Sequence, residues 1–453
     1  MDKQAVLRRL ASGKPLFCSF PFVTEKRIIG TEIEFGSVLH ANAGALEEDP
    51  RLPEVLLNGG EVYVDNGHLE YAGPEVSNAV SAVAYYEAGK LLCQNEGYCA
   101  KLYCHNRDGY GETFGAHENY FTCAPRATWK QLIPFLVTRT ILCGSGWINP
   151  SGEFEISQRA SQITCAFSEG TTYNRGVINL RHEPHAMVPG WERMHVIVGD
   201  AGMSEVSTLL RLGIMSLMVE MLECGAVPHI RYTLSQVATD IRGISVRREH
   251  WCLTGVESNT QSSLDILYVY LERAKRLFLH RDSVTDAILY IWEDTLTRLS
   301  KNPMELWRRL DWVLKHRLLE LWKNEQPNWT PPELQSQDME YHNLHPLDGL
   351  YYALHQQMEH VVSDELIRTA CFEPPGDTRA FLRGKMVQHL RKEGGRRALC
   401  TDGWQELKVV DVARSGRYYY PPDRLSTCYA SYPIPDPCET YESLLPRIVE
   451  KLS

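Results

Sequence analysis

The 453-residue sequence has no surplus of positive charge and no long apolar run. Its 47 Lys and Arg residues stand against 57 Asp and Glu residues, a formal net charge of −10, so it lacks the excess cations with which general nucleic-acid binders neutralise phosphates. The best apolar candidate, 212–227, contains Glu220 and Glu223, whereas a membrane span requires about 18 or more uninterrupted apolar residues. Lys14 interrupts the apolar stretch near the N-terminus, which is not typical of a signal peptide. We therefore expect a cytoplasmic protein with neither a nucleic-acid nor a membrane partner.

Paired cysteines and several common enzyme motifs are also missing. The 13 cysteines are odd in number and include no CxxC pair, which disfavours a zinc or disulfide framework and favours reduced thiols in the core. The sequence contains no GxxxxGKS/T loop, no GxGxxG, no HExxH and no GxSxG. If this protein binds ATP, it must do so without a phosphate loop.

Apolar periodicity divides the chain into an early region of strands and a later region of helices. Short strand-like runs separated by turn signals predict strands at 27–35, 61–64, 98–104, 177–181 and 194–198. One long apolar-periodic segment among them predicts a helix at 78–93. From residue 203 onward the period changes to 3.6 and predicts helices at 204–224, 263–280, 283–300 and 303–323. This segregation is typical of the α+β class. A change in composition near Pro374 predicts a main domain, 1–375, and a small C-terminal domain, 376–453, with a strand pair at 404–412 and 417–420.

Two carboxylates lie side by side in the sharpest local motif, GTEIEFG at 30–36. Residues two apart on a strand point to the same face, so Glu32 and Glu34 share one face while Ile33 and Phe35 share the other. Adjacent carboxylates repel each other unless they lie in open water or around a hard divalent cation. Taken alone, this motif fits a solvated sheet face better than a metal site.

The same kind of polar face recurs on further predicted strands, which changes the balance. A solvated face normally carries Lys, Ser and Thr, whereas these strands carry Glu, Asp, His, Asn and Arg. The recurrence favours one polar cavity lined for metal and phosphate. The side chains that would line it are Tyr63, Asp65, Glu70, His117, Asn179, Arg181, Glu183 and His195.

Several nearby side chains also have ordinary structural interpretations. His68 and His185 fit hydrogen-bonded structural histidines, and Arg159 fits a surface arginine. Arg379 and Arg383 lie four residues apart near the start of a predicted helix. That spacing fits either an anion clamp or a solvated helix face.

Eight motifs follow one another in order between residues 28 and 384. They are GTEIEFG (30–36), NGGEVYVDNGHLEYAGPE (58–75), FGAHENYF (114–121), PFLVTR (134–139), SQRA (157–160), INLRHEPHA (178–186), HVIVGDAGMSE (195–205) and PPGDTRAFLRG (374–384). Together they resemble the Pup ligase and Pup deamidase/depupylase family. The resemblance implies a glutamine-synthetase-like fold, in which a curved antiparallel sheet cradles ATP and Mg²⁺, helices pack on its outer side, and a small C-terminal domain follows.

The resemblance also implies roles for individual residues. Asp65 matches the family's catalytic aspartate, which in a ligase removes a proton from the attacking lysine ammonium. Tyr63 and Arg181 would lie near the metal and the phosphates of ATP, and Arg159 and Arg379 are further phosphate candidates. The implied magnesium ligands are Glu32, Glu34, Glu70, His117 and His195.

These roles imply an ATP-dependent ligase that joins the C-terminal glutamate side chain of Pup, or of a Pup-like modifier, to lysines of substrate proteins through an acyl phosphate. One alternative is the deamidase/depupylase activity, which hydrolyses the modifier's C-terminal glutamine amide or the isopeptide bond with nucleotide bound. Alternatives of other classes are a nucleotide-binding pseudoenzyme that only captures the modifier, and a ligase for small molecules.

Features that separate the two branches point in both directions. The deamidase branch usually carries a long insertion where only residues 37–57 stand here, and PFLVTR and SQRA resemble the ligase branch. The spacing of DNGH at 65–68 and the motif DTRAFLRG resemble the deamidase branch. Leu69 and Gly202 stand where both branches normally carry proline and asparagine. The balance favours a divergent ligase.

An acidic, disordered modifier needs a local basic groove on this acidic chain. Arginines and lysines cluster at 247–248 and 273–276. We expect one of these clusters to contribute to such a groove.

Overall fold

The computed structural model describes most of the chain. The described residues are 2–40, 44–49, 51–107, 111–183, 185–246, 251–256, 261–392, 397–402, 404–411 and 428–452. The basic pair Arg247 and Arg248 and the expected strand at 417–420 lie outside them.

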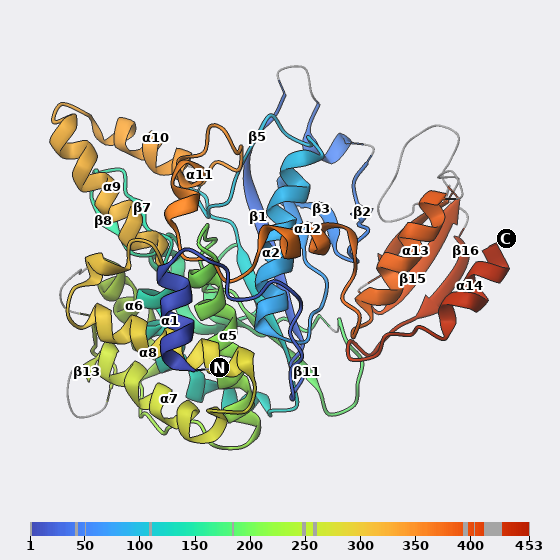
Figure 1. The fold of residues 1–453 in the computed structure, drawn as a ribbon, viewed down its shortest axis with the longest axis horizontal. Helices are drawn as coiled ribbons and strands as arrows, with labels where there is room; N and C mark the ends of the chain where they lie inside the picture. Colours follow the sequence, from blue (N-terminus) through green and yellow to red (C-terminus); the bar gives the residue numbers. More distant parts are fainter. Residues whose placement is uncertain are drawn as a thin grey trace.

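A nine-stranded sheet forms the centre of the molecule, in the order β2-β3-β4-β1-β6-β11-β10-β9 with β5 paired to β1 (Figure 1). The pairings are antiparallel except for the parallel pair β9 and β10, so the expected antiparallel sheet is in fact mixed. The strands are β1 (Ile29–Val38), β2 (Glu54–Val55), β3 (Glu61–Asp65), β4 (His68–Ala72), β5 (Lys101–Tyr103), β6 (Ala116–Thr122), β9 (Ile163–Ser168), β10 (Arg175–Asn179) and β11 (Glu192–Val196).

The two faces of β1 differ as the sequence predicts. Ile33 and Phe35 are fully buried in an apolar cluster on one face. Glu32 and Glu34 point to the other face, where they line a cavity. Burying the apolar face fixes the register of the strand, because a shift of one residue would exchange the two faces.

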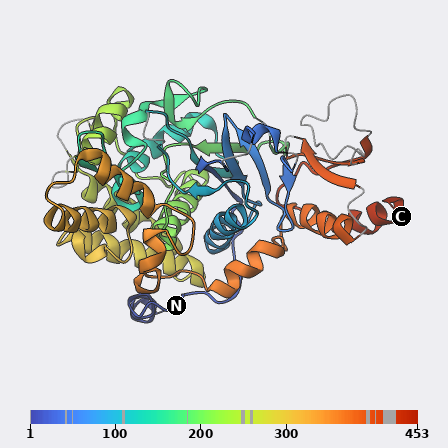
Figure 2. The ribbon, with the colours of Figure 1, turned by 90° about the horizontal axis from the view of Figure 1, so that it is seen from above.

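Helices α2 (Ala79–Asn95) and α5 (Glu205–Glu223) cover the apolar face of the sheet, as the view from above shows for α2 (Figure 2). Both are buried almost all round. Each begins at a capping side chain, because Asn78 accepts a hydrogen bond from the Ser81 amide and Ser204 accepts one from the Ser207 amide. The polar face of the sheet is thereby left for the cavity.

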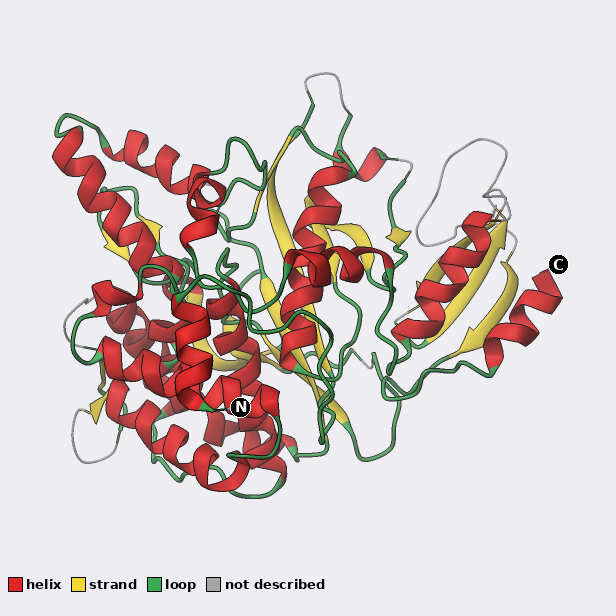
Figure 3. Cartoon of the chain, viewed as in Figure 1, coloured by secondary structure: helices red, strands yellow, loops and turns green. Residues whose placement is uncertain are grey.

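The later helices form a separate mass beside the sheet (Figure 3). The predictions at 204–224, 263–280 and 283–300 are confirmed by α5, α7 (Ser263–Phe278) and α8 (Ser283–Leu299). The single helix predicted at 303–323 is wrong, since the chain forms the 3-10 helix η5 (Pro303–Leu306) and then α9 (Asp311–Glu325). The break occurs where the buried Asp311 carboxylate turns to accept bonds from the Ser204 amide and the Tyr341 hydroxyl.

The remaining elements are short or peripheral. Within the described residues, no helix is both long enough and apolar enough to cross a membrane. These elements are α1 (Lys3–Ala11), α3 (Ile133–Thr138), α4 (Thr140–Cys143), α6 (Val237–Val246), α10 (Pro331–Tyr341), α11 (Leu350–Leu354), α12 (Asp364–Phe372), β7 (Trp147–Ile148), β8 (Phe154–Glu155), β12 (Cys252–Leu253), β13 (Gln261–Ser262), η1 (Leu46–Glu48), η2 (Arg126–Leu132), η3 (Ala160–Gln162), η4 (Leu234–Gln236) and η6 (His355–Gln357).

The C-terminal region has a sheet of its own at one end of the molecule (Figure 1), and its apolar core also includes Val55 of β2. It consists of α13 (Ala380–Lys392), β14 (Arg397–Asp402), β15 (Glu406–Asp411), β16 (Cys428–Pro433) and α14 (Leu444–Leu452). β15 falls on the strand expected at 404–412 and pairs with β14 and β16. This arrangement confirms the α+β class with a small C-terminal domain.

Candidate active site

The β3–β4 hairpin brings three acidic side chains to one place. Asn66 and Gly67 form its two-residue turn with φ angles of 48° and 83°, the left-handed conformation that an Asn-Gly turn adopts readily. The pairing of β4 with β1 sets Glu70 opposite Glu34, and Asp65 ends β3 at the turn. Ligand oxygens of Glu34, Asp65 and Glu70 therefore lie within 4.8 Å of one another.

This first cluster is electrostatically unfavourable without a cation. Glu70 is buried, and burial together with the charges of Glu32 and Glu34 raises its pKa well above the usual range. The Tyr63 hydroxyl donates a hydrogen bond to Glu70 at 2.5 Å, which orients the carboxylate. Oxygen atoms gathered in this way are the ligand set that Mg²⁺ prefers.

A second cluster forms across β1, β6 and β11. Glu32 faces His117 in the β1–β6 register, and the β6–β11 pairing brings His195 beside them. The Glu32 carboxylate lies 3.1 Å from His117 Nδ1 and 3.6 Å from His195 Nε2. Burial acts to raise the pKa of Glu32, but the nearby His117 and His195 rings outweigh it and hold the pKa well below its usual range.

His195 supplies the clearest sign that the second cluster can bind a cation. Both of its ring nitrogens are buried without a hydrogen-bond partner. Burial lowers the pKa of His195 to about 4, so the ring is neutral near pH 7 and has a lone pair to offer. Buried nitrogens without partners are costly in a protein interior unless something binds them. The residues present therefore fit a metal.

Both clusters open into one cavity with about 1530 Å³ of empty volume, including the solvent at its mouth. Arg159 and Arg181 line this cavity too. Arg159 is held in place because its loop wraps around the buried Asp200 carboxylate, which accepts a bond from the Arg159 amide at 3.1 Å. Its guanidinium donates to the Phe114 and Ile197 carbonyls at 2.6 and 3.0 Å. Arg181 is half-exposed and pairs with Glu183 at 2.9 Å.

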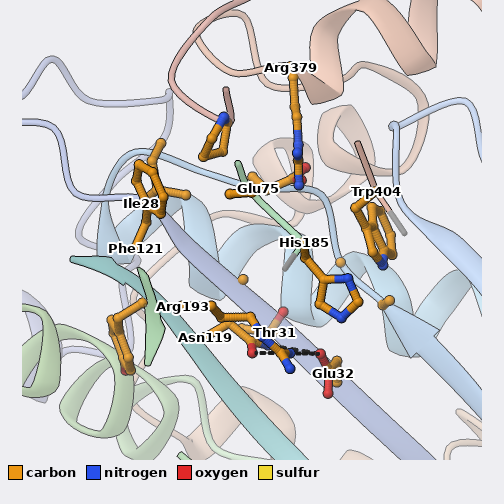
Figure 4. Close-up of a pocket in the computed structure, with 16 residues that line it drawn as sticks. Ile28, Thr31, Glu32, Glu75, Asn119, Phe121, His185, Arg193, Arg379 and Trp404 are labelled. Atoms are coloured by element: carbon orange, nitrogen blue, oxygen red, sulfur yellow. Dashed lines mark hydrogen bonds and ion pairs between the residues drawn. The ribbon is translucent and has the colours of Figure 1, made fainter. Parts of the chain in front are cut away.

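A narrower cavity adjoins the first and has about 550 Å³ of empty volume. Figure 4 shows its walls, where Arg193 and Asn119 point toward Glu32 and Trp404 and His185 stand on another side. The two cavities share residues Glu32, His185, Arg193 and Trp404. Ligands bound in the two cavities would therefore meet beside Glu32.

Arg379 lines the narrower cavity rather than the metal-lined one. It is buried and donates to Glu75 at 2.6 Å, and Arg383 also pairs with Glu75. This three-residue ion cluster joins the start of α13 to the strand region of the sheet. Arg379 thus has a structural partner, and a contact with phosphate remains a prediction.

Four residues at the cavities were not singled out from the sequence. Asn119 and Arg193 stand two residues from His117 and His195, so the period of a strand could have predicted their shared face. Asn119 donates to Glu32 at 2.9 Å, and Arg193 donates to Asn119 at 2.9 Å. Arg175 and Trp404 gave no comparable local signal, because only the tertiary fold brings them to the cavities.

A third group, formed by Glu205, His355 and His360, lies apart from both cavities. Its atoms are already used: Glu205 accepts bonds from the Val361 and Val362 amides and lies 2.8 Å from His360 Nδ1. This group fits a structural tie between α5 and the segment before α12. Arg273 and Arg276 line a different surface cavity beside His229.

A curved sheet that gathers carboxylates, histidines and arginines around one cavity is typical of an enzyme that handles metal-bound phosphate. The chain belongs to the Pup ligase family, whose Pup-ligase protein model matches residues 51–408. The expected family and the expectation of an enzyme, a ligase or its related hydrolase, are thereby confirmed.

Curated relatives include both branches of the family. The chain is 36% identical over 368 residues to a depupylase of Acidothermus cellulolyticus, covering 75% of this chain and 73% of the relative. It is 35% identical over 390 residues to a Pup–protein ligase of Kribbella flavida, covering 79% and 84%. The level of sequence identity therefore does not distinguish a ligase from a depupylase.

Solved structures of a Pup ligase resemble the whole chain. The complex between the prokaryotic ubiquitin-like protein Pup and its ligase PafA matches with a TM-score of 0.78 and 27% identity, over 94% of this chain and 92% of the other. PafA in complex with ADP matches with a TM-score of 0.76 and 27% identity, over 89% and 90%. The expected family fold is confirmed.

Proposed function

We propose that this chain is an ATP-dependent ligase that joins the C-terminal glutamate side chain of Pup, or of a Pup-like modifier, to lysines of substrate proteins. The observation that carries the proposal is the meeting of two ligand clusters in one cavity, with Asp65 exposed at its edge. The similarity to a Pup-bound and an ADP-bound ligase supports the two substrates.

The narrower cavity fits the base and ribose of ATP. Its walls include the apolar side chains of Ile28, Ala72 and Phe121 and the ring of Trp404, which suit a flat base. Arg193 at the junction of the cavities would meet the phosphates. The triphosphate then extends toward Glu32 and the two clusters.

We assign Mg²⁺ to the side chains of Glu32, Glu34, Glu70, His117 and His195. When bound, magnesium supplies positive charge that offsets the phosphate oxygens of ATP. Tyr63 orients Glu70 through its hydrogen bond, and Arg181 can move from Glu183 toward a phosphate because it is half-exposed.

The reaction follows in two balanced steps. A carboxylate oxygen of the modifier's terminal glutamate attacks the γ-phosphorus of ATP, the bond to the β-phosphate oxygen breaks, and ADP leaves. The lysine amine then attacks the carbonyl carbon of the acyl phosphate, and inorganic phosphate leaves as the isopeptide bond forms. Asp65 accepts the proton that the lysine ammonium must lose to become a nucleophile.

Hydrolysis is the second candidate, because the DNGH spacing at 65–68 resembles the deamidase branch. In that reaction water attacks the glutamine amide or the isopeptide carbonyl, and ammonia or lysine leaves. The short connection from β1 to β3 favours the ligase. The aligned share of each relative favours the ligase as well, because the alignment covers 84% of the Kribbella ligase but only 73% of the Acidothermus depupylase.

One experiment separates these functions. The protein is incubated with ATP, Mg²⁺, a lysine-bearing protein, and Pup ending in either glutamate or glutamine, and intact masses are measured. The ligase adds one modifier minus one water to the target and forms ADP. The hydrolase converts terminal glutamine to glutamate or removes the modifier without net ADP, and the pseudoenzyme changes no mass. Asp348→Asn, at an exposed carboxylate outside both cavities, is the control variant.

Two further sequence predictions are retained as part of this proposal. We infer a catalytic domain over 1–375 and a small domain over 376–453, supported by an apolar cluster drawn mainly from α13, β14, β15 and α14. A cytoplasmic location is supported by the composition alone.

A further inference from the structure

The two cavities follow one another along strand β1. On β1, Gly30 lines only the narrower cavity, Glu32 lines both cavities, and Glu34 lines only the larger one. At about 3.3 Å per residue, these positions span roughly 13 Å along the strand. A nucleotide in the narrower cavity therefore approaches from the Gly30 end, and the Glu34 end is left for the other substrate.

Arg175 lines the larger cavity at the Glu34 end. It is the first residue of β10, and it does not line the narrower cavity. The negative charges of Glu112 and Glu34 act on its guanidinium. The side chains of Thr171 and Thr172 line the same cavity just before it. This end thus combines a cation with two hydroxyl groups.

The Arg175 guanidinium has weaker hydrogen-bond partners than those of Arg181 and Arg193, which line the same cavity. Its Nε is buried without a hydrogen-bond partner, and its Nη1 lies 3.5 Å from the Gln162 side-chain oxygen. By contrast, Arg193 donates to Glu183 at 2.7 Å, and Arg181 donates to the same carboxylate at 2.9 Å. A partly buried cation with a free donor is expected to take an anion.

We propose that Arg175 binds the α-carboxylate of the modifier's C-terminal residue and thereby selects a free C-terminus. The proposal rests on the ligase or hydrolase function above, in which only the side-chain group of that residue reacts. With the α-carboxylate on Arg175, the side chain of the same residue extends toward Glu34 and Glu70, where the phosphate arrives from the opposite end. The subsite therefore distinguishes a terminal residue from an internal glutamate.

The test compares two modifiers that differ only at the terminal α-carbon substituent. One ends in a free carboxylate and the other in an α-carboxamide, and both keep the reacting side chain. The parent should lose about 10- to 100-fold in kcat/KM with the α-carboxamide, as expected for a lost charge-assisted bond. Arg175→Gln should lose a similar factor with the normal modifier, mainly in KM, and should show no further loss with the α-carboxamide.

Two controls make the result specific. Arg242→Gln removes an exposed arginine outside the cavity and should behave as the parent. Arg175→Lys keeps the charge and should keep part of the preference for the carboxylate. If Arg175→Gln fails to fold in a thermal melt, the lysine variant carries the comparison.

Two outcomes would overturn the inference. The first is that Arg175→Gln retains the parent's full preference for the carboxylate. The second is that it raises the KM for ATP and leaves the KM for the modifier unchanged. If the parent shows neither ligation nor hydrolysis, the proposed function fails separately. Calorimetric binding of the two modifiers to the parent and to Arg175→Gln then decides the subsite, and equal affinities of the parent for both modifiers would refute it.

Discussion

Glu70→Gln should stabilise the metal-free protein and abolish its stabilisation by MgATP. Ligand oxygens of Glu34 and Glu70 lie within 4.8 Å of each other, and two unit charges at that distance repel by about 3.5 kcal/mol at an effective dielectric constant of about 20. Glutamine keeps the size of the side chain and can still accept the Tyr63 hydroxyl bond. The gain in the free energy of unfolding should therefore be on the order of 3.5 kcal/mol where both carboxylates are ionised.

The sign of the pH dependence follows from the raised pKa of Glu70. Its folded-state pKa lies above the usual value of 4.5, so the folded state holds its proton to higher pH than the unfolded state does. The parent's stability from this group is fully present below about pH 4.5 and is lost as pH rises through the folded-state pKa. Glu70→Gln should remove that loss, and the two proteins should differ most at alkaline pH.

Denaturant unfolding at several pH values, without metal and with MgATP, measures both effects. A ligand at 100 times its Kd stabilises by about 2.7 kcal/mol, and this increment should be present in the parent and absent in Glu70→Gln. Asp348→Asn should keep it. The assignment of Glu70 is refuted if the variant gains the same increment from MgATP as the parent, or if its metal-free form is no more stable at alkaline pH.

Three further outcomes are expected. Asp65→Asn should bind MgATP normally in calorimetry but lose at least about 100-fold in isopeptide formation, because asparagine cannot accept the lysine proton; a parental rate would remove Asp65 from the mechanism. Glu118→Gln should cost about 3–5 kcal/mol in denaturant unfolding, since the buried Glu118 takes bonds at 2.6 and 3.0 Å from Arg139; a loss under 1 kcal/mol would contradict this. Burial raises the pKa of Glu61 to about 6 despite its bond from Thr401, so stability present below about pH 4.5 should fall by about 2 kcal/mol as pH rises through 6; Glu61→Gln should flatten this slope.

The strands and their polar face were predictable because a period of two is a local property. It set Glu32 and Glu34 on one face of β1, and the structure confirms that face. The same rule could have added Asn119 and Arg193. Helix boundaries were predictable where a capping side chain precedes an apolar stripe. The prediction of one continuous helix failed near Asp311, because the partners of its carboxylate, Ser204 and Tyr341, are distant in sequence.

What could not be predicted depends on contacts between distant segments. Glu75 pairs with Arg379 across about three hundred residues of sequence, so neither residue alone indicates that Arg379 is engaged. Trp404 reaches the cavities only because the C-terminal sheet docks beside β2. The parallel pairing of β9 with β10 places Arg175 at the cavity, and strand composition contains no signal for that choice.

The exposure of the site residues bears on which kind of amine the proposed ligase would use. Glu34 and Glu70 are buried, as ligands of a shielded cation should be, whereas Asp65 is exposed at the end of β3. A lysine on a folded protein can reach a base only at such an edge, because its chain cannot enter a closed cavity with the rest of the protein attached. A small amine would not require that exposure. The tight Asn66-Gly67 turn keeps Asp65 in the cluster with Glu34 and Glu70 while it faces outward, and this combination favours a protein acceptor over a small-molecule one.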